Sequence, residues 1–396
     1  MNETRELLER VGERFAFPDQ AFERLERRRD RKRRNQRIAA GVVGIAVFVV
    51  AIWIVTTGGP FDRTQTPGAP GPTGPDEPTT TVPTVSPPIT TAPYYTPDAR
   101  SEVDYVIDLR SGEMTPLPEA VTGTFGENAE PRFALSRYAA SSDGSMLAFV
   151  GTGEEGTPQI FIAGSDGTGV RQVTHDPTRA MSPAWSPDGS LIAYVGYGDG
   201  TGVPNVFVLD LATGEATQIT DGEVDGAVDG AVDGAWDPTF TPNGSSLVYS
   251  GGSNRVPELR TVPVDGGEST LLIGPGEGID DAGNGSISPD GSLVTFLGGG
   301  FPTSGEVGHC GPCRLVANVD GTARRVIDGW MATPTGIWSP DSSRIVTMDI
   351  ARAYRDLPPT SPNFILVVDV TTEAATIVAN GRAAIWLDDH TLLVAV

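Results

Sequence analysis

The chain has 396 residues, of which 20% are charged and 7% aromatic, and its 49 Gly and 33 Pro punctuate short apolar runs, as in a loop-rich β protein. Its formal net charge of −23 is uneven, because residues 1–37 carry +4 and the remainder carries −27. A surface this acidic repels DNA, RNA and anionic lipid, which excludes a nucleic-acid partner.

The first predicted elements are a basic helical segment over residues 1–37 and a transmembrane helix over residues 38–57. Ile38 to Val55 contains no charged residue, and 18 helical residues span roughly 27 Å, close to the thickness of a bilayer core. The basic run from Arg27 to Arg34 directly precedes it, which predicts a cytoplasmic N-terminus and an outer C-terminus. A cleaved signal peptide is the alternative, although the apolar run is long for one.

Residues 58–100 are dominated by Pro, Thr and Gly, as in the stretch from Thr66 to Pro93. Such a segment has too few apolar side chains to offset the entropy of the chain, so we expect a disordered linker. Pro-rich chain extends by about 3.1 Å per residue, so this linker reaches on the order of 120 Å.

Residues 101–396 repeat one pattern. Its clearest copy runs from Ser186-Pro187-Asp188-Gly189-Ser190 through two apolar runs to Thr213-Gly214-Glu215, which indicates four short strands joined by tight turns. The turn recurs at spacings of 45, 55, 47, 51 and 48 residues, a period typical of propeller blades. The residues at the third position of these turns are Asp143, Asp188, Asn243, Asp290 and Asp341, with a degenerate sixth copy at Asp388-Asp389.

The two ends of this region complement each other. The sixth copy supplies only two strands, over Ala384 to Val396, whereas Tyr105 to Leu117 matches the second half of a unit. We therefore predict an all-β, six-bladed β-propeller whose last blade is shared between both ends, because closure removes exposed sheet edges.

The repeated Ser-Pro-Asp-Gly-Ser turn, followed by an apolar run and by Asp210-Leu211-Ala212-Thr213-Gly214-Glu215, resembles the PD-type, WD-like repeats of TolB-like β-propellers. The resemblance covers residues 101–396. It implies an extracytoplasmic scaffold that binds other proteins and implies no shared chemistry. Ser142 and Ser342 depart from the Pro and Gly of the repeat.

Cys310-Gly311-Pro312-Cys313 is the most suggestive motif for chemistry. Outside the cell a pair of cysteines forms a disulfide, so we predict a local clip between Cys310 and Cys313. A thioredoxin-like redox site remains open, but it requires a helix after the motif, where the sequence indicates a strand. A metal site that includes His309 has too few ligands nearby.

The other candidate sites also have plainer explanations. Asp225, Asp229 and Asp233 recur every four residues, which fits duplication of a surface loop better than a calcium loop. The Asp-Gly turns lack the residues of a sialidase repeat, and no G-x-S-x-G elbow is present.

We therefore expect no catalytic residue, cofactor or metal, and interpret the protein as a single-pass membrane protein, monomeric, with its propeller outside the cell or in the periplasm. It is predicted to bind a protein or a cell-wall component. Two alternatives remain open: a propeller enzyme acting on glycans as hydrolase or lyase, and a receptor that signals across the membrane.

Overall fold

The computed structural model describes residues 90–94, 103–125, 138–197, 202–224, 232–253, 256–275, 281–299, 313–330, 337–349 and 364–396. All of them belong to one compact unit, Pro83–Val396. Among these residues no helix has the length and hydropathy needed to cross a bilayer. The expected cytoplasmic segment, transmembrane helix and most of the linker lie outside the described residues.

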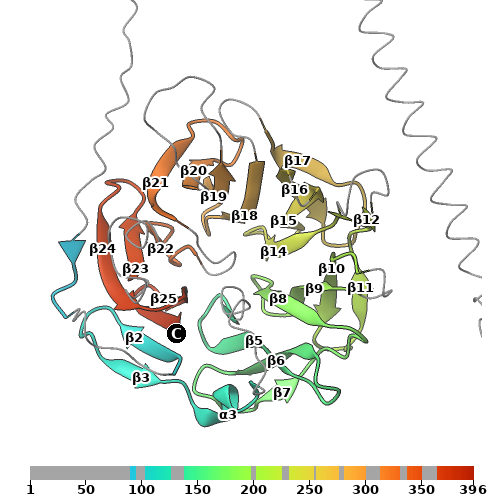
Figure 1. The fold of residues 1–396 in the computed structure, drawn as a ribbon, viewed down its shortest axis with the longest axis horizontal. Helices are drawn as coiled ribbons and strands as arrows, with labels where there is room; N and C mark the ends of the chain where they lie inside the picture. The colour runs from blue at the N-terminus through green and yellow to red at the C-terminus, as the bar shows by residue number, and fades with distance from the viewer. Residues whose placement is uncertain are drawn as a thin grey trace, which may run out of the picture. The chain divides into compact units, whose positions relative to one another are not determined.

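Six sheets, antiparallel except at one outer edge, are arranged around a central axis as the blades of a propeller (Figure 1). We number the blades in chain order. Blade 1 consists of β4 (Tyr138–Ala140), β5 (Met146–Thr152), β6 (Pro158–Gly164) and β7 (Arg171–Gln172). Blade 2 consists of β8 (Ala180–Trp185), β9 (Leu191–Gly196), β10 (Asn205–Asp210) and β11 (Ala216–Gln218).

The next two blades have the same order of strands. Blade 3 consists of β14 (Trp236–Phe240), β15 (Ser246–Ser253), β16 (Val256–Pro263) and β17 (Thr270–Ile273), and its sheet also takes in β12 (Glu223–Val224) and β13 (Val232–Asp233). Blade 4 consists of β18 (Asp281–Ile287), β19 (Leu293–Gly299), β20 (Cys313–Asn318) and β21 (Arg325–Trp330).

Blade 5 differs at both of its edges. Its regular strands are β22 (Arg344–Asp349), β23 (Phe364–Asp369) and β24 (Ala375–Asn380). Of its innermost strand, the described residues show a bridge between Trp338 and Ile345. At the outer edge β1 (Thr90–Thr91) pairs in parallel with β24, so the prediction of a disordered linker is wrong over these residues. The backbone N–H of Ala92 donates to the carbonyl of Ile377 at 3.0 Å, a contact that composition alone does not reveal.

Blade 6 closes the ring as predicted. Its inner strands are β25 (Ala383–Asp388) and β26 (Thr391–Ala395), and its outer strands are β2 (Tyr105–Asp108) and β3 (Met114–Pro116). β2 pairs antiparallel with β26. The short helix α3 (Glu119–Thr122) then leads from blade 6 to blade 1 and buries Val121.

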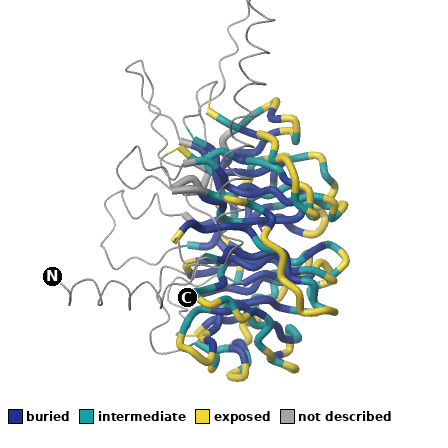
Figure 2. Tube along the Cα trace, turned by 90° about the vertical axis from the view of Figure 1, so that its right-hand side faces the viewer, coloured by how far each residue is buried: buried dark blue, intermediate teal, exposed yellow. Residues whose placement is uncertain are grey.

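The core is divided among the interfaces between blades. Each of the six neighbouring pairs of blades has its own cluster of buried apolar side chains; Ile160 of blade 1, for example, shares a cluster with Ile192 of blade 2. Figure 2 accordingly shows buried residues, in dark blue, through the interior of the propeller and exposed residues, in yellow, mostly along its outer edge. Each blade thus buries both faces of its sheet against its neighbours.

Tryptophan side chains fasten neighbouring blades at the inner strands. The indole N–H of Trp338 donates to the carbonyl of Ser286 in blade 4 at 3.0 Å, and that of Trp386 donates to the carbonyl of Ile337 in blade 5 at 3.0 Å. Trp185 makes the same contact with Ala139 of blade 1 at 3.3 Å. These residues directly precede the repeat turn, yet the sequence pattern of turns and strands did not single them out.

Candidate functional site

The predicted turn residues share one geometry. In blade 2 the Oδ1 atom of Asp188 accepts hydrogen bonds from the hydroxyl of Ser186 at 2.7 Å and from the backbone N–H of Ser190 at 3.1 Å. Asp143, Asn243, Asp290 and Asp341 accept the corresponding bonds in blades 1, 3, 4 and 5. An amide oxygen serves at Asn243, so the role depends on the acceptor atom and not on the charge.

These hydrogen bonds lower the pKa of the aspartates in the turns. The hydroxyl of Ser186, followed by the backbone and side chain of Ser190, lowers the pKa of Asp188 to about 2. Ser141 and Ser145 lower the pKa of Asp143 to about 2 in the same way. The Oδ1 atoms of these carboxylates accept hydrogen bonds from their own turn, so the turns have a structural role.

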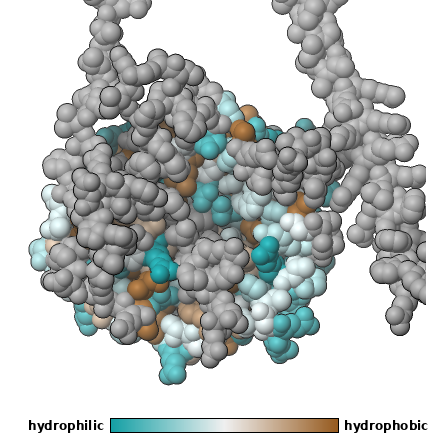
Figure 3. Space-filling view, in the orientation of Figure 1, coloured by the Kyte–Doolittle hydropathy of each residue, from teal (hydrophilic) through white to brown (hydrophobic). Residues whose placement is uncertain are grey.

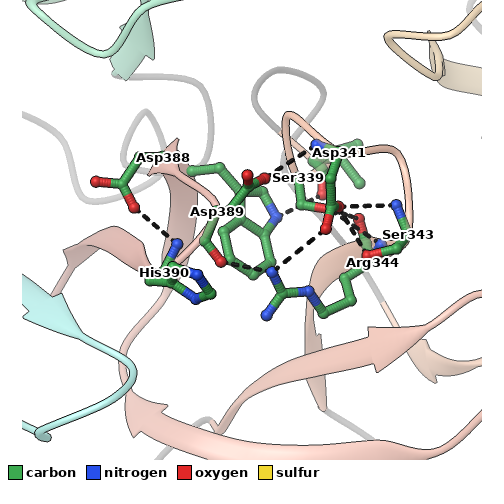
Figure 4. A network of polar contacts seen from close by, with 9 residues as sticks. Ser339, Asp341, Ser343, Arg344, Asp388, Asp389 and His390 are labelled. Atoms are coloured by element: carbon green, nitrogen blue, oxygen red, sulfur yellow. Dashed lines mark hydrogen bonds and ion pairs between the residues drawn. The ribbon is translucent and has the colours of Figure 1, made fainter.

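Neighbouring turns contact each other around one mouth of the ring. Between blades 5 and 6 the backbone N–H of Asp341 donates to Oδ1 of Asp389 at 3.0 Å, and the Arg344 guanidinium donates to the carbonyl of Asp389 (Figure 4). The same guanidinium lies over the ring of Trp386, 4.9 Å from its centroid. Between blades 1 and 2 the hydroxyl of Ser142 donates to the carbonyl of Pro187 at 2.8 Å. We call this mouth the turn face.

We call the opposite mouth of the ring the loop face. It begins where the inner strands of blades 2, 3 and 4 each depart from regular pairing. Ser182, Asp237 and Asn284 each lie six residues before the turn Asp or Asn of their blade, and each has a left-handed φ, of 52°, 51° and 49°. The pairing register shifts at all three places, so each is a β-bulge. Such backbone angles are strained for residues other than Gly and often occur at functional positions.

A buried arginine lies at the bulge of blade 4. Arg314 is 0% exposed, and its Nη1 donates to the carbonyl of Asn284 at 3.0 Å. Its Nε and Nη2 have no hydrogen-bond partner. Burial lowers the pKa of Arg314 to about 9 and raises the pKa of Asp237 to about 6, while the attraction between the two groups opposes both shifts. The sequence analysis did not identify either residue.

A cleft of about 270 Å³ opens beside blade 1 on the loop face. Its lining includes the exposed side chains of Glu154 and Glu155, together with His175 and Asp176. The buried side chain of Gln159 holds the floor in place, because its Nε2 donates to the carbonyl of Asp176 at 2.8 Å and its Oε1 accepts the N–H of Asp176 at 3.1 Å. The cleft is therefore acidic and rigid at its base.

The remaining predicted site residues are only partly placed. Cys310, His309, Asp225 and Asp229 lie outside the described residues, and of Cys313 only the backbone is described, at the start of β20. The clip between Cys310 and Cys313 stays a prediction. Within the described part of the chain, no three His, Cys, Asp or Glu side chains are grouped as metal ligands.

Comparisons with known proteins address the family. Residues 83–278 match the family model described as "PD40: TolB beta propeller domain". A TolB homologue of Chlorobium chlorochromatii is 33% identical over 76 residues, 19% of this chain and 17% of that protein. A Tol-Pal system protein TolB of Desulfosudis oleivorans is 33% identical over 73 residues, 18% of this chain and 16% of that protein.

Among solved structures, a putative TolB from Agrobacterium tumefaciens aligns with a TM-score of 0.47 and 20% identity, over 65% of this chain and 86% of that one. The chain spans less than a fifth of the length of the curated relatives it matches. Six blades and a ring closed by both ends make the folded part of the chain a six-bladed β-propeller, and its residues 83–278 are similar to the TolB beta propeller domain.

Proposed function

We propose that this protein is a membrane-tethered, extracytoplasmic scaffold whose propeller binds a protein partner on its loop face. The observation that carries the proposal is the match of residues 83–278 to the TolB propeller family, whose curated relatives include Tol-Pal system proteins. In a scaffold of this kind the blades hold surface loops in fixed positions, and the loops make the contacts.

The tether rests on the sequence. The uncharged run from Ile38 to Val55 follows the basic run from Arg27 to Arg34, and the Pro- and Thr-rich stretch after it supplies the reach of a linker. We further propose that the N-terminus is cytoplasmic and that the propeller is a monomer outside the membrane.

The loop face is the better candidate for binding because the turn face is engaged with itself. There the turn residues bond to their own turns and to the neighbouring blade. The loop face instead presents the exposed carboxylates of Glu154 and Glu155 at the rim of a cleft. Among the described residues the exposed large apolar side chains are Val103, Met114, Val256, Leu271 and Val396, and brown patches in Figure 3 lie among teal and white ones. A partner with a polar, basic surface therefore fits best.

Site-specific photocrosslinking in living cells tests the proposal. A photoreactive amino acid replaces Glu154 on the loop face or, as the matched control, Glu215 on the turn face; both are exposed glutamates. We expect one discrete adduct from position 154 and none from position 215. Adducts at neither position, with the full-length chain folded and in the membrane fraction, would contradict protein binding at this face.

The tether is tested separately. Intact cells or spheroplasts are treated with protease, and tags at the two termini are followed. The C-terminal tag should be lost and the N-terminal tag protected. The opposite pattern, or release of the chain by alkaline extraction, would contradict the proposed topology.

A further inference from the structure

The strand β1 lies on the outer edge of blade 5 but does not belong to the repeat that builds the blades. Figure 1 shows it as a blue arrow outside the red strands of that blade. It pairs in parallel with β24, whereas β22, β23 and β24 pair antiparallel with one another. Thr90 lies opposite Thr376, across a sequence separation of 286 residues. β1 is therefore held on this edge as a separate peptide would be, by the addition of a strand to a sheet.

The contact combines backbone hydrogen bonds with one buried side chain. The N–H of Ala92 donates to the carbonyl of Ile377 at 3.0 Å, and the Oγ1 atoms of Thr90 and Thr376 lie 3.4 Å apart. The side chain of Ala92 is buried in the apolar cluster between blades 5 and 6. The edge thus accepts an extended chain that carries a small apolar residue at the place of Ala92.

The segment that occupies the edge is held by few contacts. β1 consists of two residues, both exposed, and it pairs only with Thr376 and Ile377 of the six residues of β24. Alternate residues of a strand direct their N–H groups to the same neighbour, and Pro88, two residues before Thr90, has no N–H to donate. At its other end the chain turns at Pro93. A short, exposed edge strand of this kind belongs to the least stable parts of a fold.

We propose that the outer edge of blade 5 is a binding site for an extended segment of a partner protein, and that this segment takes the place of residues 90–94. A strand without proline can pair with more of β24 than β1 does and so forms additional backbone hydrogen bonds. It needs them, because β1 is part of the same chain and is present at a high effective concentration. This inference goes beyond the scaffold role and does not depend on it, since it concerns the outer edge of blade 5 and not the loop face.

The test uses the purified full-length chain in detergent and a synthetic peptide. The probe is the segment of residues 86–96 with the changes P87T, P88T and P93T and a fluorescent label at its N-terminus. The control peptide is identical except for a methyl group on the backbone nitrogen at the position of Ala92, which removes the donor to Ile377. Fluorescence anisotropy should show binding of the probe and an affinity at least about tenfold lower for the control.

Variants of the chain locate the site on β24. A92P weakens the competing β1, so the probe should bind about fivefold more tightly. T91A, at an exposed position of the same strand, should bind the probe as the wild type does. T90C with T376C joins β1 to β24 by a disulfide; binding should be lost in the oxidised form and return on reduction, with the wild type plus and minus reductant as the control.

Hydrogen exchange followed by mass spectrometry identifies the displaced segment. When the probe saturates the wild-type chain, the amides of residues 90–94 should exchange faster while those of Ala375–Asn380 stay protected. Binding that persists in the oxidised double-cysteine variant, unchanged exchange of residues 90–94 at saturation, or no binding to A92P would overturn the proposal. Dimers of A92P in light scattering would overturn it too, because the edge would then bind a second copy of this chain.

Discussion

The carboxylate of Asp104 accepts a hydrogen bond from the backbone N–H of Val396 at 2.9 Å, across a sequence separation of 292 residues. Its other oxygen accepts the hydroxyl of Tyr138 in blade 1 at 2.5 Å. One buried side chain thus ties the start of the closing blade to the end of the chain and to the next blade.

Replacement of Asp104 by Ala should destabilise the ring, because it removes both bonds and leaves the buried hydroxyl of Tyr138 without this acceptor. We expect the free energy of unfolding to fall by about 2–4 kcal/mol, measured by urea denaturation with circular dichroism. D108A, in an exposed turn of the same blade, is the control and should cost less. Equal stability of D104A and wild type would contradict this role.

The tryptophan contacts between blades predict an order of stability. W338F removes the indole donor to the carbonyl of Ser286, which should cost about 1–3 kcal/mol. W185F should cost less, because its bond to Ala139 is longer, at 3.3 Å, and Trp185 is only half-buried. Circular dichroism is the suitable probe because fluorescence changes with the tryptophan itself; the reverse order would exclude this explanation.

Two buried threonines should respond to Val in opposite directions. The hydroxyl of Thr347 is 3% exposed as a residue and has no hydrogen-bond partner, so T347V should stabilise the protein by about 1 kcal/mol. The hydroxyl of Thr295 donates to the carbonyl of Leu315 at 3.0 Å, so T295V should destabilise it. The denaturation midpoints of the two variants test this prediction. A shift of the same sign in both would contradict the different hydrogen bonding of the two hydroxyls.

The raised pKa of Asp237 predicts that the stability of the protein depends on pH. Burial raises its pKa from 3.8 to about 6, so between these values the folded protein binds more protons than the unfolded chain. Stability from this group is therefore highest below pH 4 and is lost as the pH rises through 6. The full shift corresponds to about 3 kcal/mol, and because Asp237 is only half-buried we expect a loss of about 1–2 kcal/mol.

The comparison with D237N isolates this contribution, since the turn carboxylates with lowered pKa act in the opposite direction in both proteins. The difference in unfolding free energy between wild type and D237N should shift in favour of wild type from pH 7 to pH 4.5. A difference that does not change with pH would contradict the raised pKa.

The Cys310–Cys313 pair remains a prediction from the sequence. Alkylation of the native, unreduced chain followed by mass spectrometry should leave both thiols unmodified, and reduction should add two labels. Rapid labelling before reduction would favour the redox alternative. The double variant C310S with C313S should leave crosslinking from position 154 unchanged, because the clip serves only its own loop.

The sequence was sufficient for the architecture because the repeat turn marks each blade and the half-units at Tyr105 and Ala384 mark the closure. It was not sufficient for Arg314. Ile160 occupies the equivalent position in blade 1, but this equivalence can be recognised only once the pairing of the strands is known. The connection before β20 is longer than in blade 1, so register could not be carried over by counting. β1 was missed for a different reason: Thr90 and Thr91 gain their structure from the edge of β24, far away in the chain.

The parallel pairing of β1 with β24 also determines how the molecule bears a mechanical load. A pull on the chain ahead of Thr90 acts along β1, and its first resistance comes from the bonds to Thr376 and Ile377 on the outside of blade 5. The buried Ala92 and the ring of Tyr94, which lies against Gly112, resist next. These contacts bear the load first. Tension on the chain therefore reaches the closing blade only after β1 has separated from β24.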